Sequence, residues 1–107
     1  MKEVKKEYFK RFTEDESAEP HVIKFYNEAC HLCIELKEVF EKLIKELSSD
    51  YKFVKVNTHK EKALSDLFSP IGVPTIFIYK DNDFHEIKYP HEGYTYDYLK
   101  EVLTNEE

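Results

Sequence analysis

Residues 22–33 read Val-Ile-Lys-Phe-Tyr-Asn-Glu-Ala-Cys-His-Leu-Cys, and a stripe of apolar residues continues from there to Leu47. Residues 22–26 are β-branched or aromatic except for one lysine, which predicts a strand. After Cys33 the apolar residues recur at steps of three and four, which predicts a helix over 34–47; they are Leu36, Val39, Phe40, Leu43 and Leu47. The two cysteines therefore lie where a strand gives way to a helix.

Three more strands are predicted further along the chain. Residues 53–57 and 75–79 are rich in β-branched and aromatic side chains, and the second run is almost wholly apolar, which favours burial on both faces of a sheet. A weaker strand over 84–89 follows the turn residues Asp81-Asn82-Asp83 and is expected to form a hairpin with 75–79. Strands 22–26 and 53–57 flank a helix of the length that a right-handed parallel crossover needs.

Two shorter helices and an N-terminal segment complete the pattern. Apolar residues at helical spacing predict helices over 60–68 and 95–103. The N-terminal segment also has apolar residues at helical spacing and is predicted to be a helix, although a strand over 8–12 is possible too; these residues are Val4, Tyr8, Phe9 and Phe12. The fold class is therefore α/β, with a mixed central sheet flanked by helices.

Length and composition limit the architecture and the partners. The 107 residues predict one domain over 1–107, with an N-terminal segment 1–19 and a core 20–103. The net charge is −6 with acids and bases intermixed, and the lack of a basic stripe disfavours a nucleic-acid partner. No apolar run approaches the roughly 20 residues that span a bilayer. We expect a monomer in the cytoplasm, or in a lumen or outside the cell if a signal peptide is missing from this chain.

The motif Cys30-His31-Leu32-Cys33 carries the predicted chemistry. A helix N-terminus presents unpaired N–H groups and the positive end of the helix dipole, and both stabilise a thiolate at Cys30. With two residues between them, the two sulfur atoms can meet within one helical turn. Cys30 is then expected to attack a substrate disulfide and Cys33 to resolve the mixed disulfide.

Two other interpretations of the cysteines stay open at this point. The pair could be half of a zinc site, although structural zinc needs four ligands and the five histidines show no paired ligand spacing; we expect no metal. The cysteines could also be two ordinary buried side chains, because cysteine buries readily.

Taken together, these residues resemble the thioredoxin family over about residues 20–103. The resemblance rests on three parts in the right order: strand 22–26 leading to Cys30 and Cys33, strand 53–57, and Gly72-Val73-Pro74-Thr75 opening strand 75–79. It implies a thioredoxin-like fold and a cis Pro74 packed beside the cysteine pair. It also implies that the backbone of Val73 pairs with the bound substrate chain.

The chain departs from the family pattern in four places. His31-Leu32 replaces the usual Gly-Pro or Gly-His pair, and Ala29 replaces an aromatic residue. The N-terminal strand of the family is hard to see, so the sheet is expected to be one strand short. Lys24 stands where the family has a buried acid that handles the proton of the second cysteine.

Lys24 and His31 are the residues expected to tune the thiols. A buried, charged Lys24 favours thiolates, stabilises the dithiol form and makes the pair more oxidising, whereas desolvation lowers the lysine pKa. Lys24 can instead place its amino group at the surface and bury only its stem. A charged imidazole at His31 also stabilises the Cys30 thiolate, and a merely exposed polar residue is the alternative.

The expected function is that of a thiol–disulfide oxidoreductase acting on protein or peptide disulfides with no cofactor beyond its cysteines. The direction of the reaction and the partner that recycles the pair are not predicted. The alternative is a thioredoxin-like peptide-binding module that has lost redox activity, since fold does not fix function.

Overall fold

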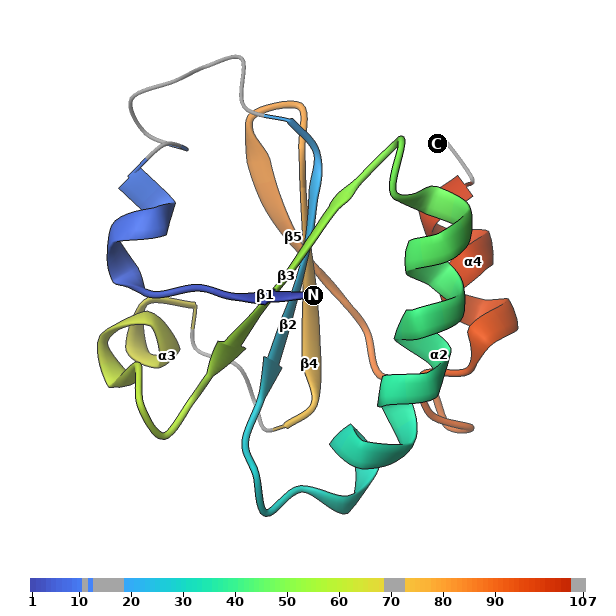
Figure 1. Ribbon diagram of the computed structural model, residues 1–107, viewed down its shortest axis with the longest axis horizontal. Coiled ribbons are helices and arrows are strands. Elements are labelled where there is room, and N and C mark those ends of the chain that lie inside the picture. The colour runs from blue at the N-terminus through green and yellow to red at the C-terminus, as the bar shows by residue number, and fades with distance from the viewer. Residues whose placement is uncertain (11, 13–18, 69–72, 105–107) are drawn as a thin grey trace.

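The computed structural model describes residues 1–10, 12, 19–68 and 73–104. Its centre is a five-stranded mixed sheet with the strand order β1-β3-β2-β4-β5 (Figure 1). β1 and β2 each pair with β3 in parallel, whereas β4 is antiparallel to both β2 and β5. The strands are β1 (Lys2–Glu3), β2 (His21–Tyr26), β3 (Lys52–Asn57), β4 (Thr75–Lys80) and β5 (Asp83–Ile87).

Helices cover both faces of this sheet. Figure 1 shows α2 (His31–Leu47) and α4 (Tyr96–Thr104) on one face, and α3 (Lys62–Phe68) with the 3₁₀ helix η1 (Lys6–Lys10) on the other. Each face has its own hydrophobic cluster, one including Leu36, Phe40 and Leu99 and the other Phe9, Phe25 and Leu64. The α/β class with a mixed central sheet flanked by helices is therefore confirmed.

The β4–β5 hairpin shows how the sequence determines a turn. Asp81 and Asn82 have φ angles of 55° and 65°, and aspartate and asparagine are the non-glycine residues that tolerate this left-handed region best. Two consecutive residues with positive φ match the twist of the flanking strands. β5 begins at Asp83 and ends at Ile87, so the strand predicted over 84–89 is shifted toward the turn.

The N-terminal segment differs most from the sequence prediction. Residues Lys6–Lys10 form a 3₁₀ helix, so the alternative of a strand over 8–12 is wrong for Tyr8, Phe9 and Lys10. The expectation that the sheet lacks a strand is also wrong, because β1 lies at its edge and pairs with Val54 and Lys55. Two exposed residues carry no alternation of apolar and polar side chains, so a strand of this length gives no sequence signal.

Within the described ranges, no helix is both long and apolar enough to cross a membrane.

Candidate active site

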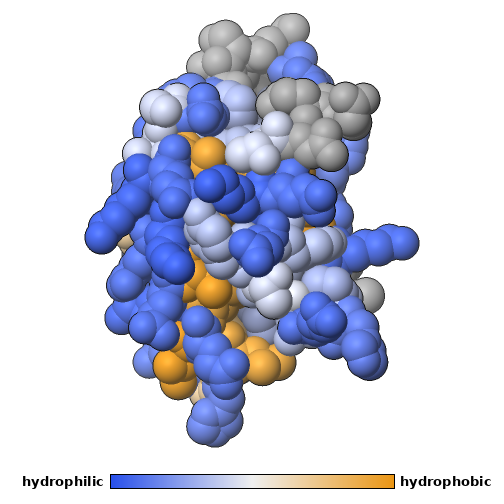
Figure 2. All heavy atoms as spheres, turned by 90° about the vertical axis from the view of Figure 1, so that its right-hand side faces the viewer, coloured by the Kyte–Doolittle hydropathy of each residue, from blue (hydrophilic) through white to orange (hydrophobic). Residues whose placement is uncertain are grey.

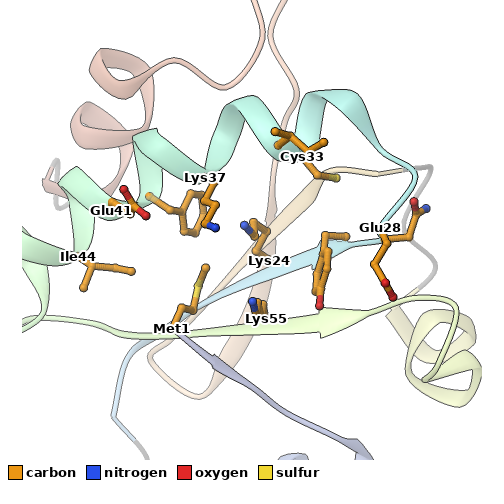
Figure 3. Close-up of a pocket in the computed structure, with 12 residues that line it drawn as sticks. Met1, Lys24, Glu28, Cys33, Lys37, Glu41, Ile44 and Lys55 are labelled. Atoms are coloured by element: carbon orange, nitrogen blue, oxygen red, sulfur yellow. The ribbon is translucent and has the colours of Figure 1, made fainter.

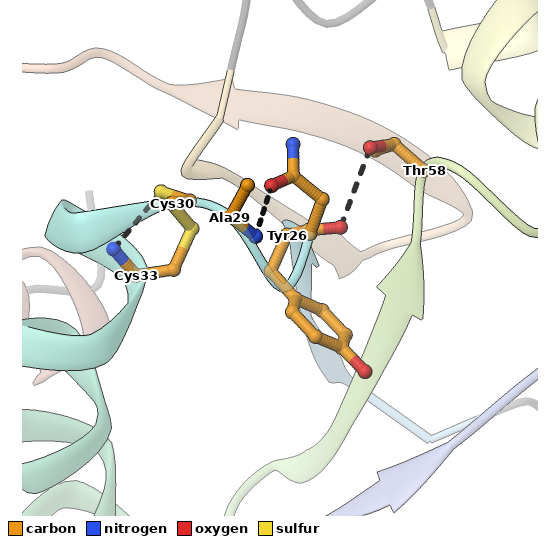
Figure 4. The surroundings of a disulfide bond; sticks show 6 residues. Tyr26, Ala29, Cys30, Cys33 and Thr58 are labelled. Atoms are coloured by element: carbon orange, nitrogen blue, oxygen red, sulfur yellow. Dashed lines mark hydrogen bonds between the residues drawn. A yellow bond between two sulfur atoms is a disulfide. The ribbon is translucent and has the colours of Figure 1, made fainter.

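Cys30 and Cys33 form a disulfide at the start of α2, with their Cα atoms 5.2 Å apart. Cys30 is the N-cap residue: its φ and ψ of −91° and 110° are extended, and its Sγ accepts a hydrogen bond of 3.0 Å from the Cys33 N–H (Figure 4). The cap therefore uses sulfur where a serine or aspartate oxygen is usual. The same N–H is placed to stabilise a Cys30 thiolate after reduction, together with the helix dipole.

The two sulfur-bearing residues differ in their access to solvent. Cys30 is partly exposed, whereas Cys33 is 6% exposed. The loop before them is held by Asn27, whose Oδ1 accepts a hydrogen bond of 2.9 Å from the Ala29 N–H. An incoming disulfide can therefore reach Cys30, while Cys33 is protected from it.

Lys24 lies on β2 below the cysteine pair and is only 5% exposed. Its Nζ is 5.0 Å from the centre of the Phe40 ring and 5.7 Å from that of Tyr26, so it contacts π faces that favour a cation. Among the described residues no carboxylate forms an ion pair with it. Burial, together with the charges of the nearby Lys55 and Lys37, lowers the pKa of Lys24 to about 8.

A cavity of about 290 Å³ joins Lys24 to Cys33, and we call it the Lys24 cavity (Figure 3). It lies between α2 and strands β2 and β3. Its wall carries three lysines, two glutamates and several apolar side chains; the full lining is Met1, Lys24, Tyr26, Asn27, Glu28, Cys33, Ile34, Lys37, Phe40, Glu41, Ile44 and Lys55. The alternative that Lys24 merely snorkels to the open surface does not fit its burial.

His31 is exposed at the first position of α2, next to Cys30. No hydrogen bond or ion pair fixes its ring among the described residues. It can therefore act on the Cys30 thiolate only through its charge and its nearness in sequence. Its role as a tuning residue stays a prediction.

Val73 and Pro74 line an open groove of about 520 Å³, which we call the Pro74 groove. The peptide bond between them is cis, as the family resemblance implies. Leu32, from between the two cysteines, lies in the same groove, whose other residues are Thr75, Glu86, Lys88, Tyr89 and Tyr94. The structure thus brings the cysteine motif and the Val73–Pro74 segment, some 40 residues apart, to one surface.

Sequence reasoning missed the aromatic side of this groove. Tyr89 is 47% exposed, and its ring packs edge-on against Tyr94 at 4.8 Å. Tyr94 is buried, and its hydroxyl donates a hydrogen bond of 2.6 Å to the Ile87 carbonyl. Both tyrosines lie outside the cysteine motif and the Val73–Pro74 segment, so no motif of the sequence placed them in the groove.

Hydrophobic surface gathers around the start of α2. Leu32 and Ile34, in its first turn, are 48% and 62% exposed. Figure 2 shows the face of the molecule formed by α2 and α4, where most side chains are hydrophilic and a hydrophobic area lies toward the lower end, from which α2 rises. Exposed apolar side chains beside a reactive disulfide mark a surface suited to contact with another chain.

The comparisons with known proteins decide the family. The thioredoxin family model matches residues 1–105. The chain belongs to the thioredoxin family.

Individual relatives agree with that assignment. A thioredoxin of Borreliella burgdorferi is 39% identical over 57 residues, which are 53% of this chain and 49% of that protein; the match thus spans about half the length of that relative. Fasciola hepatica thioredoxin superimposes with a TM-score of 0.82 at 19% identity, over all of both chains. Oxidised mitochondrial thioredoxin 3 of Saccharomyces cerevisiae gives 0.81 at 19% identity, over 98% of this chain and 94% of the other. At such identities the two structures support the fold alone.

A metal site was one open interpretation of the cysteines. In the part of the chain that the structure describes, no three histidine, cysteine or acidic side chains come together as metal ligands. Cys30 and Cys33 are joined to each other.

Proposed function

We propose that this protein is a thiol–disulfide oxidoreductase that acts on protein or peptide disulfides through Cys30 and Cys33. One observation carries the proposal: the two cysteines form a disulfide across the first turn of α2, with one partly exposed and the other buried. Membership of the thioredoxin family supports it. The two cysteines supply the redox chemistry, and no further cofactor takes part.

The reaction of the reduced protein proceeds in two exchanges. The Cys30 thiolate attacks one sulfur of the substrate disulfide, a mixed disulfide forms, and the first substrate thiolate leaves. The Cys33 thiolate then attacks the Cys30 sulfur, the second substrate thiolate leaves, and the disulfide of the protein re-forms. Two electrons pass from the cysteine pair to the substrate, and the same steps in reverse oxidise a dithiol.

The Pro74 groove is the proposed binding place for the substrate chain. Backbone groups of Val73 are expected to pair with the substrate, and exposed Leu32 and Tyr89 offer apolar contact. A protein or peptide segment fits such an open groove better than a small disulfide does, because its walls extend well beyond the two sulfur atoms.

Lys24 is the proposed tuning residue for Cys33. An ammonium group on the same cavity as Cys33 stabilises a thiolate there. This favours the reduced form and makes the disulfide a better oxidant than it is in relatives with an acid at this position. A charged Lys24 already holds its proton. It can therefore accept the proton of the Cys33 thiol only after it has lost one itself.

Equilibration in glutathione buffers of graded ratio, followed by alkylation and mass measurement, tests the proposal. We expect one reversible two-electron transition, with a midpoint less negative than the about −270 mV of a thioredoxin-type reductant. Cys33→Ser should accumulate a mixed disulfide with a peptide substrate, and Cys30→Ser, its matched control, should not. A protein that shows no reversible transition is instead a peptide-binding module.

A further inference from the structure

The Lys24 cavity carries positive charge, and among the described residues no acidic side chain of its wall forms an ion pair with its lysines. Lys24 comes from β2, Lys55 from β3 and Lys37 from α2, and all three side chains line the same space (Figure 3). Because these ammonium groups line one cavity, the charges of Lys55 and Lys37 add to burial, the largest cause, in lowering the pKa of Lys24. A pKa of about 8 still leaves Lys24 mostly charged at pH 7.

The nearby acids do not remove this charge. Glu28 and Glu41 are exposed residues at the wall of the cavity, and Glu28 accepts a hydrogen bond of 3.3 Å from the Asn57 amide. Neither forms an ion pair with a lysine of the cavity within the described ranges. The Nζ atoms of Lys24 and Lys55 instead lie 5.7 Å and 5.3 Å from the centre of the Tyr26 ring.

Apart from Asn27, the remaining wall of the cavity is mainly apolar. Phe40 and Ile44 of α2 line the cavity, and Met1 lies near Ile44 in its wall (Figure 3). Burial of a short hydrocarbon chain there is favourable because it removes apolar surface from water. A volume of about 290 Å³ is near the lower end of ligand-binding cavities, which suits a small molecule.

We propose that the Lys24 cavity binds a small carboxylate with a short hydrocarbon tail, with its carboxylate among Lys24, Lys37 and Lys55 and its tail against Phe40 and Ile44. The cavity uses a different side of α2 from the Pro74 groove, because residues 33, 37, 40 and 44 line it and residue 32 lines the groove. The ligand therefore does not compete with a substrate chain for the same surface.

Occupancy of the cavity is coupled to the state of Cys33. Reduction cleaves the Cys30–Cys33 bond with two electrons and places a thiol or thiolate of Cys33 at the cavity wall. A Cys33 thiolate repels a bound carboxylate, so the carboxylate binds the oxidised protein more tightly. By linkage, the ligand shifts the disulfide toward the oxidised form by the same factor. Only this coupling rests on the proposed function; the binding itself does not.

The first experiment measures binding to the oxidised protein. Hexanoate is titrated into ¹⁵N-labelled protein, and we expect saturable shifts of the backbone amides around Lys24, Cys33 and Phe40 with a dissociation constant of about 1 mM or below. Hexanol has the hydrocarbon tail without the negative charge, and inorganic phosphate has negative charge without a tail. The two controls therefore test whether each part of the ligand is needed. Either control saturating the same amides as tightly as hexanoate overturns the proposal, as does hexanoate failing to saturate.

Matched lysine variants locate the site. Lys37→Gln removes an exposed ammonium from the cavity and should weaken hexanoate binding at least about threefold. Lys45→Gln removes an exposed ammonium of the same helix that lies outside the cavity lining and should leave binding unchanged. Equal effects of the two variants would mean that the helix charge as a whole, and not the cavity, attracts the anion.

The second experiment tests the coupling. The glutathione midpoint is measured with and without saturating hexanoate, and the dissociation constant is measured for both redox states. A tenfold weaker binding to the reduced protein should appear as a midpoint about 30 mV more negative. Binding that is equal in the two states overturns the coupling, whereas a protein without a redox transition refutes the proposed function and leaves the binding result standing.

Discussion

Lys24 holds an ammonium group at an interior position, and the free energy of unfolding should show this through its pH dependence. The pKa of Lys24 is about 8 in the folded protein against 10.5 for an ordinary lysine. Between these values the unfolded chain binds more protons than the folded one, so this residue makes stability rise with pH from about 8 to about 10.5. Below about pH 8 Lys24 is charged in both the folded and the unfolded chain. Its destabilising contribution to the free energy of unfolding is then independent of pH.

Replacement of Lys24 by methionine therefore measures how much the buried ammonium group lowers the free energy of unfolding. We expect Lys24→Met to raise the free energy of unfolding at pH 7 by about 2 to 3 kcal/mol, and the gain should shrink steadily as the pH rises from about 8 to about 10.5. Urea unfolding of both proteins across this range measures it. Tyr26 and Tyr94, whose pKa values are raised to about 12, lower stability only above about pH 10, so the comparison is made chiefly between pH 7 and pH 10. A gain that is the same at every pH would show that packing, and not charge, causes it.

His31 should act on Cys30 through charge alone, because it is exposed and adjacent in sequence. We expect His31→Ala to raise the Cys30 pKa only modestly, because solvent screens the imidazole charge. The rate of alkylation against pH measures it. His31→Lys keeps a positive charge at the same place and should hold the pKa low; identical profiles for the alanine and lysine variants would contradict the prediction.

At the scale of the helix, the cap of α2 gives Cys30 a part in the stability of the fold. The Sγ of Cys30 accepts the Cys33 N–H, a donor that otherwise has no partner within the helix. Cys30→Ser keeps an acceptor at this position and Cys30→Ala does not, while both variants lack the disulfide. We expect the serine variant to be more stable by about 1 kcal/mol in thermal unfolding. Equal stability would mean that the cap contributes nothing.

The elements that the sequence predicted well are those with a long apolar pattern. The stripe from Leu36 to Leu47 is buried at its repeating positions except Val39, which is partly buried. The strands now called β2, β3 and β4 agree with their predicted ranges within one residue at each end. β1 went unrecognised because its two residues are held by β3, through the pairing of Lys2 with Val54, and not by any pattern of their own. Tertiary contact decides such an edge strand, and a sequence pattern cannot record it.

The candidate site was predictable only in part, for a related reason. Cys30 and Cys33 are neighbours in sequence, so their spacing and the strand–helix junction reveal them. Lys24 was identified, but its burial was open between two alternatives, because burial depends on Phe40 packing over it. The lysines that share its cavity and the tyrosines of the Pro74 groove come from other elements, and the fold alone brings them near the cysteines.

In the whole molecule, a cavity and a separate groove lie on different sides of α2. One is the Lys24 cavity, which contains three lysines and Cys33, and the other is the largely apolar Pro74 groove, which contains Leu32. A group that tunes the thiols can therefore change without altering the surface that contacts a substrate chain. This separation predicts that substitutions in the groove affect large substrates more than small ones.

Leu32 offers the sharpest test of that separation. It is 48% exposed, so Leu32→Ser should fold normally and should lower kcat/KM for a protein disulfide about five- to tenfold, because one apolar contact is worth roughly 1 to 1.4 kcal/mol. Reaction with a small disulfide such as oxidised glutathione should change less than about twofold, since that molecule does not fill the groove. Leu67→Ser is the matched control: Leu67 is 74% exposed on α3, across the sheet from α2, and its loss should affect neither substrate. An equal loss for both substrates in Leu32→Ser would place the residue in the chemistry of the thiols and not in the recognition of the chain.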